Sequence, residues 1–210
     1  MIIKKINLAK EKIIQKLLGV IYRLDNSGNS FFDKNGELFF SNLFVNEEKN
    51  NNPVIFDIGA NIWEYSELFV KKLNNNKYTL HIFEPQKNCF IDLLKKFKDN
   101  KNVFLNNFGI SDDDRTATIY KNEDKSGLTS LYKRNIDFYK MKMNVQEEID
   151  LKRADTYIRS KNIEHINLLK IDVEGHEIAA LYGFGDYLNG DFIDYIQFEY
   201  GGANLDSHTN

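Results

Sequence analysis

Four ionisable residues follow an apolar run late in the chain. In the stretch LLKIDVEGHE, the residues Asp172, Glu174, His176 and Glu177 come directly after a segment with the pattern of a buried strand. Carboxylates and an imidazole at such a place can act as a general base, position a hydroxyl group or bind a metal ion. Several metals suit these ligands, so the sequence leaves the metal open. The other interpretation is that Asp172 or Glu174 caps the next helix and that His176 is exposed.

A glycine turn and an acidic residue form a second group nearer the N-terminus. In VIFDIGAN, Gly59 permits a tight turn, and Asn61 adopts a left-handed backbone almost as readily as glycine does. The amides that follow open a helix, and this end of a helix favours negative charge. Glu84 ends the next apolar run, where an acid typically accepts hydrogen bonds from ribose hydroxyls. Together with Asp57, these residues indicate a nucleotide-cofactor site, and the alternative is a turn glycine with a solvated acid.

Apolar periodicity predicts the elements that position these residues. Strands are expected at 54–59, 80–85, 102–110, 166–172 and 192–200, and helices at 64–73, 88–97 and from Glu174 onward. A short helix at 155–162 is expected to be capped by Asp155. This alternation predicts an α/β fold, in which a parallel sheet carries helices on both faces. Such sheets bind ligands beyond the carboxyl ends of their strands, where the strand order reverses.

Residues 111–150 interrupt the alternation. RTATIYK, residues 115–121, alternates like an exposed strand, and residues 137–154 contain one more strand candidate. We interpret this segment as an insertion over the rim of the sheet, where such folds place substrate loops.

The first 52 residues form an extension to the domain that is expected at 53–210. MIIKKINLAKEKIIQKLLGVIYRL predicts an amphipathic helix that packs on the domain or on a second copy, or lies on a membrane surface. No apolar run is long enough to span a bilayer. A loop with a short hairpin around KNGE, residues 34–37, and a polar linker that closes at Pro53 are expected to follow.

Composition restricts the class of protein. The 210 residues suffice for one domain with a sizeable core. The 28 basic residues are offset by 31 acidic ones, so the formal net charge of −3 does not favour nucleic acid as the partner. The single cysteine, Cys89, rules out an internal disulfide and fits a reducing compartment, so a cytoplasmic location is expected. Cys89 falls on an apolar helical pattern and is expected in the core with Phe90, Leu93, Leu94 and Phe97.

Six stretches, taken in order, resemble the FkbM-type S-adenosylmethionine-dependent methyltransferases. They are FDIGAN, HIFEP, GISDDDR, GLTSLY, LLKIDVEGHE and IQFEYGGANLDSHT. The resemblance implies the Rossmann-like sheet of class I methyltransferases and S-adenosylmethionine as cofactor. It also implies methylation of a hydroxyl group on a sugar, a glycan or a secondary metabolite, as in polysaccharide biosynthesis.

The resemblance further implies roles for individual residues. The methionine part of the cofactor would be lined by Asp57, Gly59, Ala60 and Asn61, and the ribose would be bound by Glu84. The adenine side would be formed by Ser111 and Asp112. The catalytic rim would consist of Asp172, Glu174 and His176, and a base, His176 or Asp172, would take the proton of the acceptor hydroxyl.

Two features depart from the family pattern. Trp63 stands where the family has glycine. An indole that points into the cleft would fill the space of the methionine part, whereas one that points outward would leave binding intact. The sequence also ends after the fifth predicted strand, without the family's C-terminal antiparallel strand pair. The open edge would then pair in a homodimer or be covered by the N-terminal segment.

The sequence is therefore consistent with two functions. One is an active O-methyltransferase. The other is a degenerate, non-catalytic family member that serves as a binding or scaffold module, because Trp63 stands in the cofactor loop and the final strands are missing. A nicotinamide-dependent enzyme is disfavoured, since the turn lacks the usual three glycines.

Overall fold

The computed structural model describes residues 14, 16–17, 19–21, 36–48, 51–73, 77–122, 129–132 and 142–199. Its contacts divide the chain into two units, Met1–Glu47 and Glu48–Asn210. In the first unit, residues 14, 16–17 and 19–21 are helical, in agreement with the predicted N-terminal helix.

The helix α2 (Glu37–Glu48) begins where a hairpin was expected. The hairpin prediction around KNGE is wrong, because Gly36 adopts a left-handed backbone and its carbonyl accepts a hydrogen bond from the amide of Phe40. The following residues continue as a helix that buries Phe44 and Val45. The polar linker that was expected from residue 46 is therefore helical as far as Glu48.

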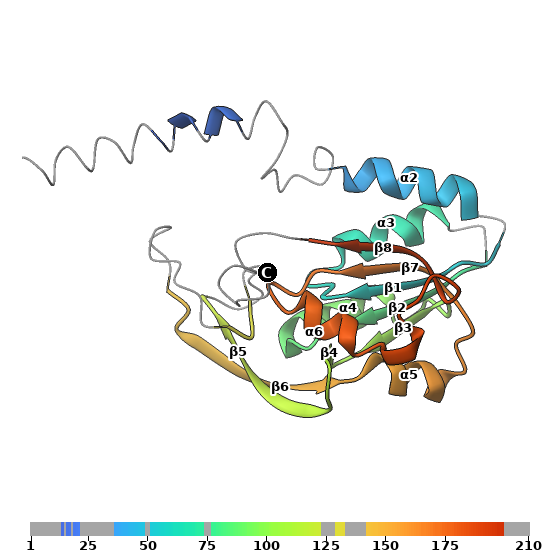
Figure 1. The fold of residues 1–210 in the computed structure, drawn as a ribbon. Helices are drawn as coiled ribbons and strands as arrows, with labels where there is room; N and C mark the ends of the chain where they lie inside the picture. The colour runs from blue at the N-terminus through green and yellow to red at the C-terminus, as the bar shows by residue number, and fades with distance from the viewer. Residues whose placement is uncertain are drawn as a thin grey trace, which may run out of the picture. The chain divides into compact units, whose positions relative to one another are not determined.

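The second unit is built around five parallel strands (Figure 1). They are β1 (Val54–Ile58), β2 (Thr79–Phe83), β3 (Val103–Asn106), β7 (Ile166–Ile171) and β8 (Ile193–Phe198), in the spatial order β3-β2-β1-β7-β8. The α/β prediction is confirmed, and the order reverses between β1 and β7 as in doubly wound sheets. β8 pairs only with β7 among the described strands. The expected absence of a final antiparallel pair is not tested, because residues 200–210 lie outside the described residues.

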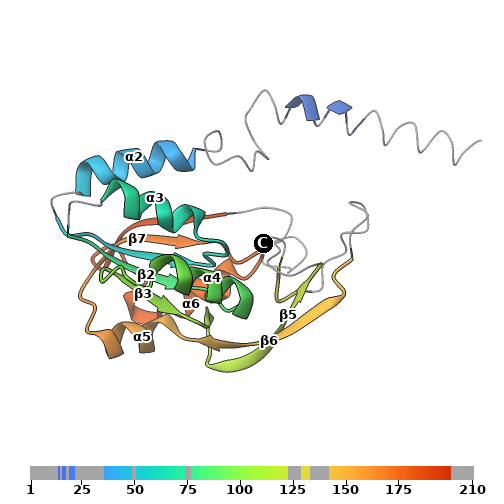
Figure 2. The same cartoon turned by 180° about the vertical axis from the view of Figure 1, so that it is seen from behind.

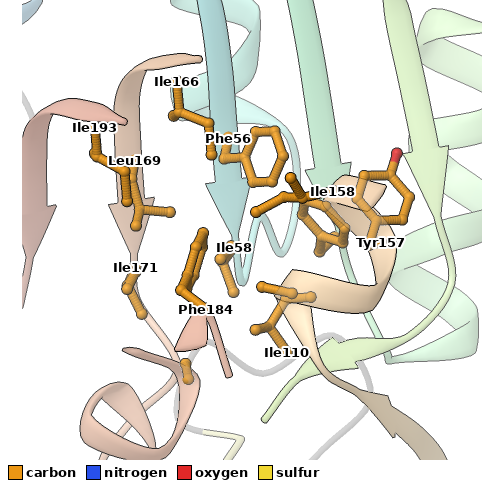
Figure 3. Packing of buried hydrophobic residues seen from close by; sticks show 13 residues of the cluster. Phe56, Ile58, Ile110, Tyr157, Ile158, Ile166, Leu169, Ile171, Phe184 and Ile193 are labelled. Carbon is orange, nitrogen blue, oxygen red and sulfur yellow. The ribbon is translucent and has the colours of Figure 1, made fainter. Parts of the chain in front are cut away.

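Helices cover both faces of this sheet. α3 (Glu64–Lys72) and α4 (Lys87–Phe97) belong to one face, and α5 (Ala154–Lys161) and α6 (Glu177–Tyr182) to the other, as the two opposite views show (Figures 1 and 2). On the second face, Phe56 and Ile58 of β1 pack with Ile158 and Phe184 in one buried cluster (Figure 3). Because both faces are covered, the central strands β1, β2 and β7 are mostly buried, and most of their residues are apolar.

A second sheet of three strands, β4-β6-β5, follows the main one. It consists of β4 (Gly109–Ile110), β5 (Arg115–Lys121) and β6 (Val145–Lys152), and β5 and β6 are antiparallel. The prediction of one strand over 102–110 is therefore wrong. The side-chain amide of Asn107 donates to the carbonyls of Glu84 and Pro85, and the chain leaves the main sheet there before it pairs with β6.

Two local predictions are corrected by the helices. Asp155 does not cap α5, because the N-cap is Arg153, and the Asp155 carboxylate accepts a hydrogen bond from the Arg153 guanidinium instead. Leu94 is 42% exposed rather than buried, whereas Cys89 is buried as expected. No helix among the described residues has the length and apolar character needed to cross a membrane.

Candidate active site

The strands of the main sheet end level with one another. Ile58 pairs with Phe83 of β2 and with Ile171 of β7, and all three are the last residues of their strands. The loops that follow therefore leave the sheet at one edge, at the point of strand reversal. A cavity of about 200 Å³ opens there, lined by these loops and by the small sheet.

The cavity lining has a polar and an apolar part. The polar part includes Asn61 and Glu84 from the loops after β1 and β2, and Asp172, Glu174 and His176 from the loop after β7. The apolar part includes Ile110 with Ile119, Ile149 and Leu151, and the last three form the core of the small sheet. The described parts of the 111–150 segment, 111–122, 129–132 and 142–150, thus contribute to the rim of the main sheet, as the sequence predicts.

Glu84 joins the first two loops. One carboxylate oxygen accepts a hydrogen bond from the Asn61 amide at 2.8 Å, and the other accepts one from the Gln86 amide at 2.7 Å. The side chain is almost completely buried, and burial raises the pKa of Glu84 to about 7 against the opposing effect of these two amides. Each carboxylate oxygen has a second lone pair, so Glu84 can accept further hydrogen bonds from a ligand in the cavity.

The β1 loop passes very close to the β7 loop. A Cβ atom at Gly59 would lie 1.9 Å from the carbonyl oxygen of Asp172, and φ at Gly59 is +84°. Only glycine fits both the contact and the left-handed backbone. Asn61 also has a positive φ of 46°, as its predicted role in the turn requires.

Trp63 is not among the residues that line the cavity. It adopts a left-handed backbone, φ 78° and ψ −7°, at the N-cap of α3, which is the conformation that favours glycine. Its indole ring lies beside α4, with the Lys96 ammonium 5.8 Å from the ring centroid. Lys96 also forms an ion pair with Glu67 of α3. The departure from the family pattern thus places a residue with a Cβ atom in a left-handed backbone, and whether it affects cofactor binding stays a prediction.

Asp57 lies beneath the loop rather than in the cavity. Its carboxylate is fully buried, and Oδ2 accepts a hydrogen bond of 2.5 Å from the Ser66 hydroxyl. Its Oδ1 accepts no hydrogen bond among the described residues, and the ammonium of Lys170 lies 3.6 Å away. The same ammonium lies 3.3 Å from Asp172 Oδ2. Lys170 therefore connects the buried acid of β1 to the acid at the end of β7.

The loop after β7 is shaped by Glu177. Its carboxylate accepts hydrogen bonds from the amides of Val173 and Gly175 at 3.0 to 3.2 Å, while Glu174 and Gly175 both have positive φ. Glu177 is buried and does not line the cavity. Glu177 is thus separated from the other three ionisable residues of this loop, and no group of three or more potential metal ligands occurs within the described residues.

His176 is buried and has a partner on each ring nitrogen. Nε2 lies 3.0 Å from the Ser111 hydroxyl oxygen, and Nδ1 lies 3.1 Å from the Tyr132 hydroxyl oxygen. Burial, with a smaller contribution from the charge of Arg115, lowers the pKa of His176 to about 4. The imidazole is therefore neutral at pH 7, and the interpretation of His176 as an exposed residue is wrong.

Ser111 and Asp112 lie on the Nε2 side of the His176 ring. The Ser111 hydroxyl donates to Asp112 Oδ1 at 2.9 Å, and Arg115 donates to both side chains. Neither Ser111 nor Asp112 lines the cavity, and neither does Ala60.

Comparison with known proteins identifies the family. The family described as Methyltransferase FkbM domain matches residues 57–206, which is more than half of the chain. The chain belongs to the FkbM methyltransferase family. It is 25% identical, over 179 residues, to the protein named Methyltransferase 1 from Beauveria bassiana (strain ARSEF 2860), and the match covers 78% of this chain and 70% of that protein.

A solved structure of the family is also similar. It is the crystal structure of Methyltransferase FkbM from Methylobacillus flagellatus KT, with a TM-score of 0.42 and 17% sequence identity. The match covers 64% of this chain, which spans only 29% of the length of that structure.

Membership in a methyltransferase family implies a methyl donor, and several of the predicted site residues meet at one cavity. Gly59, Asn61, Glu84, Asp172, Glu174 and His176 line it. Sequence reasoning missed Lys170, Gln86 and Tyr132. A lysine in an otherwise apolar strand was a usable signal for Lys170, whereas Tyr132 is 44 residues from His176, and no local pattern predicts their contact.

Proposed function

We propose that this family member is an S-adenosylmethionine-dependent O-methyltransferase that acts on a hydroxyl group of a sugar, a glycan or a secondary metabolite. One observation carries the proposal: the acid expected to bind the ribose, Glu84, and the groups able to accept a proton, Asp172 and His176, line the same cavity. A cofactor site and a proton acceptor must be adjacent if a methyl group is to pass directly to an oxygen.

The residues around the cavity fit the cofactor. Glu84 holds two backbone amides and retains lone pairs for ribose hydroxyls. The aliphatic side chains of Ile110 and Leu151 offer an apolar surface to a purine ring. When bound, S-adenosylmethionine would supply a methyl group on a positively charged sulfur to an attacking oxygen. The carboxylates of Glu84 and Asp172 give the cavity acceptors that suit a cationic ligand.

The protein's own contribution is alignment and proton removal. Holding two reactants in the correct orientation supplies roughly 7–11 kcal/mol of barrier lowering in favourable cases. The hydroxyl proton must also leave, and a positioned base contributes about 10²–10⁴-fold. Asp172 is held by Lys170 and is partly exposed, so it can orient an acceptor hydroxyl, while neutral His176 has a lone pair for the proton.

The alternative, a non-catalytic binding module, rests on Trp63. Its indole lies beside Lys96 and outside the cavity lining, which favours a working cofactor site. The finer expectations, a cytoplasmic location, a homodimer and a membrane-surface role for the N-terminal helix, remain predictions. The half-exposed side chains of Ile14, Leu17 and Ile21 in that helix are compatible with the last two.

A methyl-transfer screen tests the proposal. The purified chain is incubated with radiolabelled S-adenosylmethionine and panels of sugars, glycans and hydroxylated polyketides, beside Asp172→Asn as the active-site variant. Glu148→Gln, an exposed change in β6 outside the cavity, is the control. We expect label transfer by the wild type and the control, and a loss of at least about 10²-fold in Asp172→Asn. Equal transfer by all three proteins, or none with any hydroxyl acceptor, would contradict the proposal.

A further inference from the structure

The hydrogen-bond partners of His176 determine which ring nitrogen carries its proton. The Ser111 hydroxyl lies 3.0 Å from Nε2 and 2.9 Å from Asp112 Oδ1, but it has only one proton to donate. The bond from Ser111 and the charge of Arg115 lower the pKa of Asp112, so this carboxylate is ionised at neutral pH and can only accept. A charged acceptor binds a hydroxyl proton more strongly than a neutral imidazole does.

The Ser111 proton therefore goes to Asp112. The Ser111 oxygen then has two lone pairs, and one accepts from Arg115 Nη1 at 3.2 Å. The other lone pair faces Nε2 of His176, which must carry a proton in order to make the bond. In the opposite tautomer, Asp112 would lose its bond from Ser111, and a hydrogen bond to a charged group is stronger than one between neutral groups.

The other face of the ring agrees with this assignment. If Nε2 is protonated, Nδ1 has the free electron pair and accepts from the Tyr132 hydroxyl at 3.1 Å. Burial raises the pKa of Tyr132, so its phenol is protonated at pH 7 and able to donate. Each hydrogen bond among Arg115, Asp112, Ser111, His176 and Tyr132 then has one donor and one acceptor.

Tyr132 belongs to the segment 129–132, which forms hydrogen bonds with two of the loops around the cavity. The Thr129 hydroxyl donates to Gln86 Oε1 at 3.2 Å, next to Glu84, and the Ser130 hydroxyl donates to the carbonyl of Glu174 at 2.7 Å. Backbone hydrogen bonds in both directions join Ser130 to Tyr120 of β5. These contacts tie the segment to the loops after β2 and β7, and its residues Thr129, Ser130 and Leu131 line the cavity directly before Tyr132 in the chain.

We propose that Ser111 and Asp112 are positioning residues that hold His176 as its Nε2–H tautomer, and that the acceptor's proton passes through the Tyr132 hydroxyl to Nδ1. This inference rests on the proposed methyl transfer and deepens it. It also gives Ser111 and Asp112 a role behind the catalytic imidazole instead of beside the adenine.

The proton balance of this step is complete. The acceptor's O–H bond breaks, and its electron pair stays on the oxygen for the new bond to the methyl carbon. The bond from that carbon to the donor sulfur would break, and the sulfur would keep its electron pair. The proton binds the Tyr132 oxygen while the phenol's own proton moves to Nδ1, so Tyr132 ends as a neutral phenol and His176 as an imidazolium. The positive charge lost from the methyl donor is thus replaced by one on His176, and the charge of the site is unchanged.

Nitrogen NMR of the histidine side chains tests the tautomer without any substrate. We expect His176, assigned with a His176→Gln variant, to show a protonated Nε2 and an unprotonated Nδ1 at pH 7. Asp112→Asn should produce a mixture of both tautomers, because the Ser111 proton is no longer held by a charge. Asp113→Asn is the matched control, since Asp113 pairs with Arg115 and forms no hydrogen bond with Ser111 among the described contacts. His81, buried against Tyr157, is an internal control that should not change in either variant.

A predominantly protonated Nδ1 in the wild type, or identical spectra of Asp112→Asn and Asp113→Asn, would overturn the inference. These spectra are readable even if the protein transfers no methyl group, so failure of the proposed function is seen separately. With an acceptor from the screen, Tyr132→Phe should lower kcat by about 10²–10⁴-fold and change KM by less than about 3-fold. An unchanged kcat in Tyr132→Phe would exclude the phenol from the proton's path.

Discussion

At Trp63, the contributions of the backbone conformation and of the side chain to stability can be measured separately. Its left-handed conformation, φ 78°, costs a residue with a Cβ atom about 1–2 kcal/mol. Glycine avoids this cost, but its larger loss of backbone conformational entropy on folding disfavours the folded state by about 0.5–1 kcal/mol. A glycine should thus be better than an alanine at this position by about 0.5–1 kcal/mol.

The indole side chain, in contrast to the backbone conformation, stabilises the folded state. The indole is half-buried and lies 5.8 Å from the Lys96 ammonium, which is worth about 0.5–1 kcal/mol at an exposed site. Burial of half of the ring adds about 1 kcal/mol. We therefore expect Trp63→Ala to lower the free energy of unfolding by about 1.5–2 kcal/mol and Trp63→Gly by only about 1 kcal/mol.

Urea unfolding followed by circular dichroism measures this difference, because the chain has a single tryptophan and both variants lack its fluorescence. Affinity for S-adenosylhomocysteine, measured beside it, should change by less than about 3-fold in either variant, since the indole lies outside the cavity lining. Trp63→Ala as stable as Trp63→Gly would refute the backbone argument. A gain of cofactor affinity above about 10-fold in both variants would show that the indole obstructs the site.

Three further predictions concern the elements that support the cavity. Burial lowers the pKa of His81 to about 4, so at pH 5 the unfolded chain binds a proton there that the folded chain does not. The free energy of unfolding should therefore fall as the pH drops from 6.5 towards 4, by up to about 3 kcal/mol from this residue. In urea titrations at several pH values, His81→Asn should show a weaker dependence of stability on pH than the wild type, and an equal dependence would refute this. Gly59→Ala should destabilise the chain by at least about 3 kcal/mol and abolish cofactor binding, whereas Gly190→Ala, with no atom within 4 Å of the added Cβ, should be close to neutral in the same thermal melts. Lys170→Met should lower the free energy of unfolding by about 3–5 kcal/mol, because it removes the cation beside buried Asp57. Adding Asp57→Asn should recover part of this stability, and additive destabilisation in the double variant would contradict an energetic coupling of the two residues.

The positions of the strands were predictable because they depend on local patterns. Apolar runs bounded by Asp57–Gly59 and by Glu84–Pro85 locate the ends of β1 and β2 to within about two residues. Parallel strands place their carboxyl ends at one edge, so the meeting of Glu84 with Asp172 at one cavity also followed from the sequence.

The contacts that depend on tertiary packing were not predictable. Ser111 and His176 are 65 residues apart, and the bond between them requires the chain to leave the main sheet at Asn107 and join a second sheet. Asp57 was expected in the cavity, but its alternation in β1 places it on the face where Ser66 of α3 packs. The contact of the Trp63 indole with Lys96 of α4 is likewise not indicated by any local pattern in the loop.

A calorimetric titration of the wild-type chain with S-adenosylmethionine and S-adenosylhomocysteine tests the central claim most directly. Glu84→Gln is measured beside it, because its amide places an N–H group against one of the backbone amides that the carboxylate now accepts. At pH 8, where Glu84 with its pKa of about 7 is mostly ionised, we predict micromolar binding of both ligands by the wild type and affinity lower by about 10- to 100-fold in the variant, the loss of a hydrogen bond to a charged group. A folded wild-type chain that binds neither ligand, or a Glu84→Gln variant that binds as tightly as the wild type, would contradict the account.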